Sequence, residues 1–294
     1  MAIFKGAGVA IATPFQADGS VDYKEFDRLI EFQIENGTDA IIVCGTTGES
    51  STMSEQEHIE VVRHCIERVA HRVPVIAGAG SNATHTAVEL SKEAEAYGAD
   101  AILSVTPYYN KATQEGLFRH YSAVSEAVNI PIIVYNVPGR TNLNVLPETM
   151  ARLVKETAHV RAVKDATGDL AQCAMMMELA GETLEVFAGN DDVIVPTMAL
   201  GGLGVISVLS NIAPKQTHDM CAACLAGDYR QAAAMQKQAM PLIKALFMEV
   251  NPIPVKKALS YLGYRSAYLR LPLTDMSEAN AERLKSAMEA YGLL

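Results

Sequence analysis

The residue of this sequence with the clearest chemical potential is Lys164, the only lysine inside a predicted strand. Because side chains alternate along a strand, Lys164 shares a face with Ala162 and opposes Val163. If that face is the interior of the protein, loss of hydration lowers the pKa of the amine, and a neutral amine can form a Schiff base with a ketone. A strand-end lysine that reaches solvent or forms an ion pair is the ordinary alternative.

Two residues around the end of the preceding strand could act with this lysine. Tyr135 ends that strand, so its phenol is expected beside Lys164, where it could move protons during imine formation. The alternative is a core aromatic whose hydroxyl is satisfied by the fold. Arg140 lies in the loop that follows, and its planar guanidinium suits a carboxylate, although a single arginine more often forms an exposed salt bridge.

Polar loops also follow two other predicted strands. Thr46 and Thr47 lie between glycines, and their backbone amides and hydroxyls could hold a carboxylate, with a plain turn as the alternative. Tyr108 and Tyr109 form an aromatic pair, and exposed aromatics in a loop often belong to an interface. Each of these residues is only a weak indication of a functional site by itself. All of them follow the ends of predicted strands, so we expect them to lie together at one edge of the sheet.

Motifs for several other chemistries are missing from the sequence. The chain has no HExxH, no GK[ST] phosphate loop and no GxGxxG after its first strand. Cys221 and Cys224 form a CxxC, but no second pair accompanies it and the surrounding alanines suit the core side of a helix. We therefore expect no metal site.

Eight short apolar runs recur along the chain, of the kind that form parallel strands buried on both faces. They lie at 8–12, 40–43, 75–77, 101–105, 132–135, 160–164, 185–188 and 205–208. Helical patterns alternate with them: Asp22 and Ser54 each begin a capping box, and Pro147 begins a further helix. The alternation predicts the α/β class, and eight units favour a (β/α)8 TIM barrel, whose active site lies at the C-terminal ends of the strands.

The pattern becomes purely helical after about residue 225. Helices are predicted at 228–250, 255–262 and 277–291, with linkers at 251–254 and 271–272. We therefore predict a barrel catalytic domain over residues 1–225 and an appended helical region over residues 226–294.

Charge and composition exclude several classes of partner. The 294 residues carry a formal net charge of -10, so the cationic surface of a nucleic-acid binder is missing and anionic lipid would be repelled. The N-terminus lacks the apolar stretch of a signal peptide, and the five cysteines are an odd number, which fits a reducing compartment. We expect a cytoplasmic enzyme without nucleic-acid or membrane partners.

Three motifs resemble those of the dihydrodipicolinate synthase / N-acetylneuraminate lyase family. They are GTTGES at 45–50, YNVPGRT at 135–141 and VKDATGD at 163–169, and the match covers essentially the whole chain. The resemblance implies a Schiff-base lyase in which pyruvate forms an imine with Lys164 and the derived enamine adds to L-aspartate 4-semialdehyde, a step of lysine and diaminopimelate biosynthesis. The alternatives are a pyruvate-releasing sugar-acid aldolase of the same family and a keto-acid-binding barrel without turnover.

The resemblance also implies roles for individual residues. Lys164 would be the Schiff-base lysine, and Tyr135, Thr47 and Tyr109 the proton relay, with Tyr109 supplied by the neighbouring subunit of a homotetramer built as a dimer of dimers. Thr46 and Thr47 would hold the pyruvate carboxylate. No cofactor or metal is implied. The remaining pocket residues would be Arg140, which binds the semialdehyde carboxylate and favours the synthase over the sugar-acid lyases, and Gly189 and Ile206, which line the pocket.

A second, regulatory pocket is also implied by the resemblance. Ser50, His58, Asn82 and Tyr108 match the positions at which lysine-inhibited relatives bind lysine. Lysine-sensitive members carry a histidine and a glutamate at two further positions, where this chain has Glu55 and Thr86. Loss of the carboxylate at position 86 removes a partner for the lysine amines, so we expect weak or absent inhibition by lysine.

Overall fold

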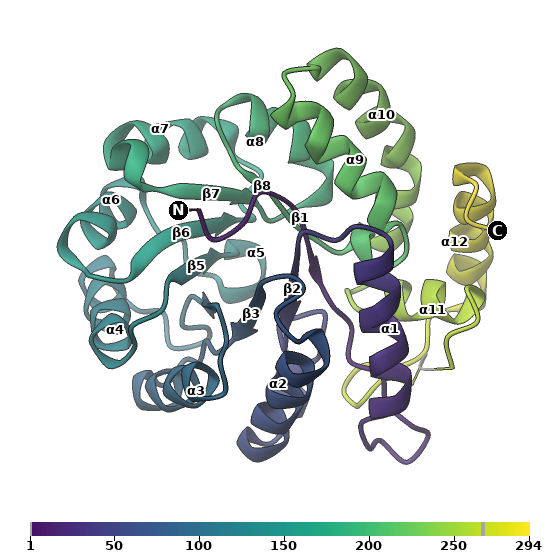
Figure 1. Cartoon of the computed structure of the whole chain (residues 1–294), viewed down its shortest axis with the longest axis horizontal. Coiled ribbons are helices and arrows are strands. Elements are labelled where there is room, and N and C mark those ends of the chain that lie inside the picture. Colours follow the sequence, from purple (N-terminus) through teal and green to yellow (C-terminus); the bar gives the residue numbers. More distant parts are fainter. Residues whose placement is uncertain (1, 266–267) are drawn as a thin grey trace.

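Eight parallel strands close into a barrel in the order β1 to β8 (Figure 1). The computed structural model describes residues 2–265 and 268–294. The strands are β1 (Gly6–Ala10), β2 (Ala40–Val43), β3 (Val75–Gly78), β4 (Ala101–Val105), β5 (Ile132–Asn136), β6 (Val160–Asp165), β7 (Glu185–Ala188) and β8 (Gly204–Ser207). The predicted (β/α)8 barrel is confirmed, and each predicted strand overlaps an observed one.

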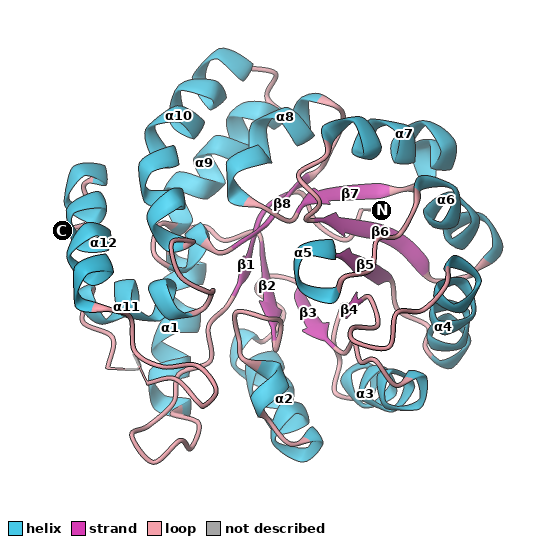
Figure 2. Ribbon diagram, turned by 180° about the vertical axis from the view of Figure 1, so that it is seen from behind, coloured by secondary structure: helices cyan, strands magenta, loops and turns pink. Residues whose placement is uncertain are grey.

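Helices form the outer ring and continue beyond it (Figure 2). They are α1 (Tyr23–Glu35), α2 (Glu55–Val69), α3 (Thr84–Ala96), α4 (Gln114–Ala127), α5 (Pro138–Thr141), α6 (Pro147–Glu156), α7 (Leu170–Ala180), α8 (Ile194–Ala199), α9 (Pro214–Leu225), α10 (Tyr229–Leu246), α11 (Ile253–Tyr261) and α12 (Glu278–Tyr291). Short 3-10 turns lie at η1 (Ser50–Thr52), η2 (Gly181–Thr183), η3 (Asp191–Val193) and η4 (Leu209–Asn211).

The strands are mostly apolar because both of their faces are largely buried. One face packs against the helical ring, and the other fills the inside of the barrel with residues such as Ile42, Leu103 and Ile206. At the N-terminal end of the barrel, the ring of Phe4 stacks on that of Phe187, with 4.2 Å between their centroids. The N-terminal segment thus covers this end, while α5 lies across the opposite end (Figures 1 and 2).

The sequence signals for helix starts match the observed caps. The Asp22 carboxylate accepts a hydrogen bond from the Glu25 amide at 3.0 Å, and the Ser54 hydroxyl accepts one from the Glu57 amide at 3.2 Å. The first strand was placed two residues too late, because Ile11 and Ala12 continue its apolar run. The backbone amide of Ala12 bonds to the side chain of Asn211 instead of joining the sheet ladder.

The three predicted C-terminal helices are confirmed as α10, α11 and α12. α11 starts at Ile253, inside the stretch predicted as a linker, because proline is tolerated in the first turn of a helix. In both views α12 lies at the outer side of the molecule (Figures 1 and 2). α10 starts close to the expected boundary after residue 225, and the division into two domains stays a prediction.

No helix of residues 2–265 and 268–294 has both the length and the apolar character needed to cross a membrane.

A buried ion pair joins the C-terminal helices to the loop after β2. Lys256 of α11 pairs with Glu49, and each side chain is only 1% exposed. The Lys256 ammonium also donates a hydrogen bond to the Tyr268 carbonyl at 2.9 Å and lies 4.1 Å from the centre of the Phe15 ring. Burial lowers the pKa of Lys256 to about 8, and Glu49 opposes this change. The pair therefore holds α11 against a loop that also carries Thr46 and Thr47.

We expect Lys256→Met to lower the free energy of unfolding by about 3–5 kcal/mol, because it leaves the Glu49 carboxylate buried without its cation. Adding Glu49→Gln to this variant removes the unpaired charge and should restore most of the loss. Chemical denaturation monitored by circular dichroism measures both effects, with Lys257→Met as the matched control. Equal free energies of unfolding for Lys256→Met and the double variant would show that the unpaired Glu49 charge is not the cause of the loss.

Candidate active site

Lys164 and Tyr135 meet at the C-terminal end of the barrel. They are register partners on β6 and β5, and the Lys164 Nζ lies 4.3 Å from the centre of the Tyr135 ring. Ala162 contributes to the packing inside the barrel and Val163 to the outer layer, as strand alternation requires. The Lys164 side chain is therefore directed inward, and the residue is only 6% exposed.

Burial has a direct effect on the charge of this amine. It lowers the pKa of Lys164 from 10.5 to about 7. The negative charge of Asp191 opposes this change, and the positive charge of Arg140 adds to it. A large fraction of the side chain is thus uncharged near neutral pH, which is the state that attacks a carbonyl carbon.

Tyr135 is buried beside the amine as a protonated phenol. Burial raises its pKa, while Arg140 and a hydrogen bond with the Thr46 side chain act in the opposite direction. A neutral phenol in contact with a threonine hydroxyl can accept one proton as it gives up another. The structure thus brings Thr46, rather than Thr47, to the hydroxyl of Tyr135.

Thr47 has a different partner. Its Oγ1 accepts a hydrogen bond from the Asn251 Nδ2 at 3.0 Å, and the residue is buried. The carbonyl of the same asparagine accepts a hydrogen bond from the Arg140 Nη2 at 3.2 Å. Sequence reasoning assigned no role to Asn251, since it lies 204 residues from Thr47 in a stretch that looked like a linker.

Asp191 is a second residue of the site that sequence patterns did not single out. It lies in η3 after β7, and its Oδ2 accepts hydrogen bonds from the backbone amides of Val208 at 3.1 Å and Leu209 at 2.9 Å. Burial raises the pKa of this carboxyl group, while hydrogen bonds and Lys164 lower it. Its place just after a barrel strand could have marked it as a site residue. Asp192 is adjacent, however, and the sequence alone did not distinguish the two.

Gly189 directly follows β7, and Ile206 lies on the neighbouring strand β8. The Gly189 amide donates to the Asp165 carbonyl at 2.7 Å, and a Cβ at residue 189 would lie 2.7 Å from that of Ala166. Glycine is therefore needed for the close approach of β7 to β6. Ile206 lies on β8 and is fully buried inside the barrel.

Tyr109 does not reach the site of its own chain. The residue is 89% exposed. Its backbone adopts a positive φ of 74°, which is uncommon for a residue with a side chain. The loop thus presents the phenol to solvent.

A cavity of about 400 Å³ lies at the mouth and contains most of the residues matched to the regulatory pocket. Thr46, Val137 and Arg140 form its inner side. Its outer lining includes Ser50, Glu55, His58, Thr86 and Tyr108. His58 is held by a 2.6 Å hydrogen bond from its Nε2 to the Gly78 carbonyl, and burial lowers its pKa. Asn82 does not line this cavity, and its carbonyl accepts a hydrogen bond from Asn110.

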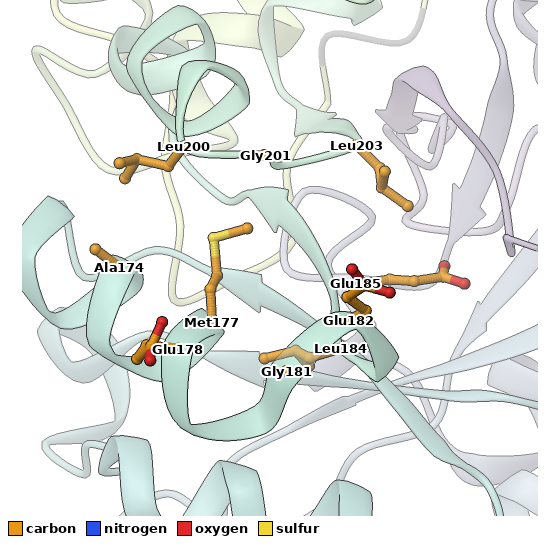
Figure 3. Close-up of a pocket in the computed structure, with 10 residues that line it drawn as sticks. All are labelled: Ala174, Met177, Glu178, Gly181, Glu182, Leu184, Glu185, Leu200, Gly201 and Leu203. Atoms are coloured by element: carbon orange, nitrogen blue, oxygen red, sulfur yellow. The ribbon is translucent and has the colours of Figure 1, made fainter.

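Another cavity, of about 500 Å³, lies at the opposite end of the barrel (Figure 3). It is formed where β7 begins, with the Met177 side chain pointing toward the segment from Leu200 to Leu203. Its polar residues are Glu178, Glu182 and Glu185. It contains no lysine, arginine or tyrosine, whereas the cavity at the mouth includes Arg140 and Tyr108 and is therefore the better candidate for an anionic keto acid.

The model of the Dihydrodipicolinate synthetase family matches residues 3–291 of this chain. The chain belongs to this family. A relative from Lachnoclostridium phytofermentans, named 4-hydroxy-tetrahydrodipicolinate synthase, is 54% identical over all of both chains. One from Caldicellulosiruptor bescii with the same name is 55% identical over 100% of this chain and 99% of its own. The crystal structure of dihydrodipicolinate synthase from Thermotoga maritima is 45% identical, with a TM-score of 0.97 over 100% of both chains.

Membership in the dihydrodipicolinate synthetase family confirms the resemblance inferred from the three motifs. In the described residues, no group of three or more histidine, cysteine, aspartate and glutamate side chains is placed to hold a metal ion. Cys221 and Cys224 are buried and unbonded, and burial raises the pKa of each thiol. These two cysteines therefore belong to the core.

We expect Lys164→Met to stabilise the protein, and more so at pH 6 than at pH 9. Below a pH of about 7 the lysine is charged in both states, so the folded state bears the whole cost of burying the charge. As the pH rises toward 10.5 the folded amine is neutral while the unfolded one is still charged, and the cost declines. The gain should therefore fall by about 2.7 kcal/mol between pH 6 and pH 9.

Urea denaturation at the two pH values measures this difference. Lys155→Met, at an exposed lysine, is the control that should show little change with pH. A gain that is independent of pH would contradict a desolvated amine at residue 164.

Proposed function

We propose that this chain catalyses the 4-hydroxy-tetrahydrodipicolinate synthase reaction, condensing pyruvate with L-aspartate 4-semialdehyde in lysine and diaminopimelate biosynthesis. The observation that carries the proposal is the buried amine of Lys164, with its lowered pKa, against the phenol of Tyr135 in a chain of this family. The names of the curated relatives support the choice of this reaction within the family.

The reaction starts with the neutral Nζ of Lys164 attacking C2 of pyruvate. Tyr135 gives a proton to the departing hydroxyl, water leaves, and an imine forms. Loss of a proton from C3 gives the enamine, whose carbon bonds to the aldehyde carbon of the semialdehyde. The new alkoxide takes up a proton and becomes the 4-hydroxyl group. The semialdehyde amine then attacks C2, closes the ring and releases Lys164.

We assign the threonine of the proton relay to Thr46, in place of the Thr47 expected from the resemblance. Thr46 and Tyr135 line one small cavity and Thr46 lowers the pKa of Tyr135, whereas the Thr47 hydroxyl accepts a hydrogen bond from Asn251. Thr47 and the backbone of its loop are then available for the pyruvate carboxylate. Arg140, at the mouth, has the charge and the planar geometry to bind the carboxylate of the semialdehyde.

We also propose that two subunits complete each site within a homotetramer built as a dimer of dimers. Tyr109 is too exposed to act in its own chain, and an exposed aromatic side chain of this size suits a partner's site. The enzyme would act in the cytoplasm. The outer part of the cavity, around Ser50, His58 and Tyr108, would bind lysine weakly, since Thr86 offers no carboxylate there.

Reductive trapping tests the imine directly. Pyruvate followed by borohydride should add a reduced three-carbon adduct to the peptide that contains Lys164, and Lys164→Ala should abolish it. Since only the neutral amine reacts, the rate of imine formation should rise with pH and level off above a pKa of about 7. A pH-independent rate, or an adduct on another peptide, would contradict the proposal.

Product assays distinguish the alternatives that remain within the family. The synthase should consume pyruvate only when L-aspartate 4-semialdehyde is present, and should release no pyruvate from N-acetylneuraminate. Pyruvate release from the sugar acid would favour the lyase. An adduct without turnover of either substrate would favour a keto-acid-binding barrel.

Mixing inactive variants tests the shared site. Tyr109→Phe and Lys164→Ala should each lose at least about 100-fold in kcat. When the two are unfolded together and refolded, mixed dimers contain one site with both residues intact, so activity should return to roughly a quarter of wild type if subunits pair at random. Tyr135→Phe mixed with Lys164→Ala is the matched control and should give no recovery, because both residues belong to one chain. Equal recovery, or none, in the two mixtures would rule out sharing of Tyr109.

A further inference from the structure

One residue of the C-terminal region contacts two substrate-binding loops. Asn251 lies between α10 and α11 and is 5% exposed. Its side chain donates a hydrogen bond to the Thr47 Oγ1 at 3.0 Å, and its backbone carbonyl accepts one from the Arg140 Nη2 at 3.2 Å. Thr47 follows β2 and Arg140 follows β5, so Asn251 joins two segments that come from separate strands of the barrel.

The direction of the first hydrogen bond decides what Thr47 can do. A hydroxyl has one proton and two lone pairs, and here one lone pair accepts the bond from the Asn251 amide. The hydroxyl proton therefore remains available for an acceptor on another side, and the accepted bond strengthens it as a donor. A carboxylate accepts hydrogen bonds only, so Asn251 keeps Thr47 in the state that a keto-acid carboxylate needs.

The second hydrogen bond acts on a side chain that is otherwise free to move. Arg140 belongs to the exposed residues at the mouth, where a long side chain samples many rotamers. Its bond to the Asn251 carbonyl limits the directions in which the guanidinium can point. A carboxylate-binding arginine is most effective when its fork is held in place before the substrate arrives.

Asn251 is itself held in place by the segment that follows it. Five residues further along the chain, the Ile253–Tyr261 helix carries Lys256, whose ion pair with Glu49 joins it to the loop of Thr47. The backbone amide of Arg270 also donates to the Glu49 Oε2 at 3.1 Å. The loop after β2 is thus held by the C-terminal region at two points, Thr47 and Glu49.

Stability alone does not account for an asparagine at this place. Its Oδ1 is buried and has no hydrogen-bond partner among the described residues. An unpaired buried acceptor costs free energy, so an apolar side chain of similar size would be the better choice for packing. The polar group is therefore better explained by its effect on the site.

We propose that Asn251 is a positioning residue, which sets Thr47 as a hydrogen-bond donor to the keto-acid carboxylate and orients Arg140 for the second carboxylate. This inference rests on the proposed function, because it takes pyruvate and the semialdehyde as the ligands of these two residues. It assigns to the C-terminal helical region a direct part in building the site, rather than that of an appendage.

A double-mutant cycle between Asn251 and Thr47 tests the proposal. Asn251→Ala should raise the pyruvate concentration for half-maximal reductive trapping about 5- to 10-fold, the effect of one hydrogen bond of ordinary strength. In a Thr47→Val background, the same substitution should change it less than 2-fold, because the acceptor is gone. Equal changes in both backgrounds would show that Asn251 does not act through Thr47.

Two further variants separate positioning from folding. Asn251→Asp keeps the size of the side chain but cannot donate, and Thr47 would then give its proton to the carboxylate, so the loss of pyruvate affinity should at least equal that of Asn251→Ala. Asn36→Ala is the matched control: its amide donates to the Phe32 carbonyl at the end of α1, and trapping should not change.

The outcomes distinguish this inference from the proposed function. If wild-type protein forms no reduced adduct with pyruvate, the proposed function fails. If wild type is trapped normally and both Asn251 variants, folded by circular dichroism, keep its half-saturation for pyruvate, the positioning role is wrong while the proposed function stands.

Discussion

The chemistry of the site depends on the withdrawal of one amine from water. Lys164 sits inside a barrel whose other interior residues are mainly apolar, and this loss of hydration brings its pKa close to neutrality. The cost of burying the group must be met by the rest of the fold, which supplies a continuous apolar interior and a helical ring around it. Asp191 limits how far the pKa falls, so the amine is reactive without losing its ability to bind a proton.

The polar groups around this amine come from distant parts of the chain and are held by one another. Thr46 and Tyr135 form one contact beside the lysine, and Thr47, Asn251 and Arg140 form a second chain of hydrogen bonds at the mouth. The barrel strands fix the first group, because register pairs Tyr135 with Lys164. The second group depends on the C-terminal helices, whose buried ion pair with Glu49 holds them against the barrel.

Much of the fold and the centre of the site could be predicted from the sequence, because both follow from short-range patterns. Eight apolar runs between helical stripes lead to a closed barrel, and alternation along one strand directs Lys164 inward. The finer contacts could not be predicted in this way. Thr46 and Thr47 are adjacent, and only the conformation of their loop decides which of them meets Tyr135. Asn251 was missed because its contacts cross more than 100 residues and its proline neighbours suggested a linker.

The stacked rings of Phe4 and Phe187 have a consequence for the order of events at the lysine. They belong to the buried apolar cluster inside the barrel, so the amine is approached from the mouth, where Arg140 lies. Whatever reacts with the amine first must pass the position where the second reactant later sits. We therefore expect the keto acid to react with the amine before the aldehyde enters, and the ring product to leave before the next keto acid binds.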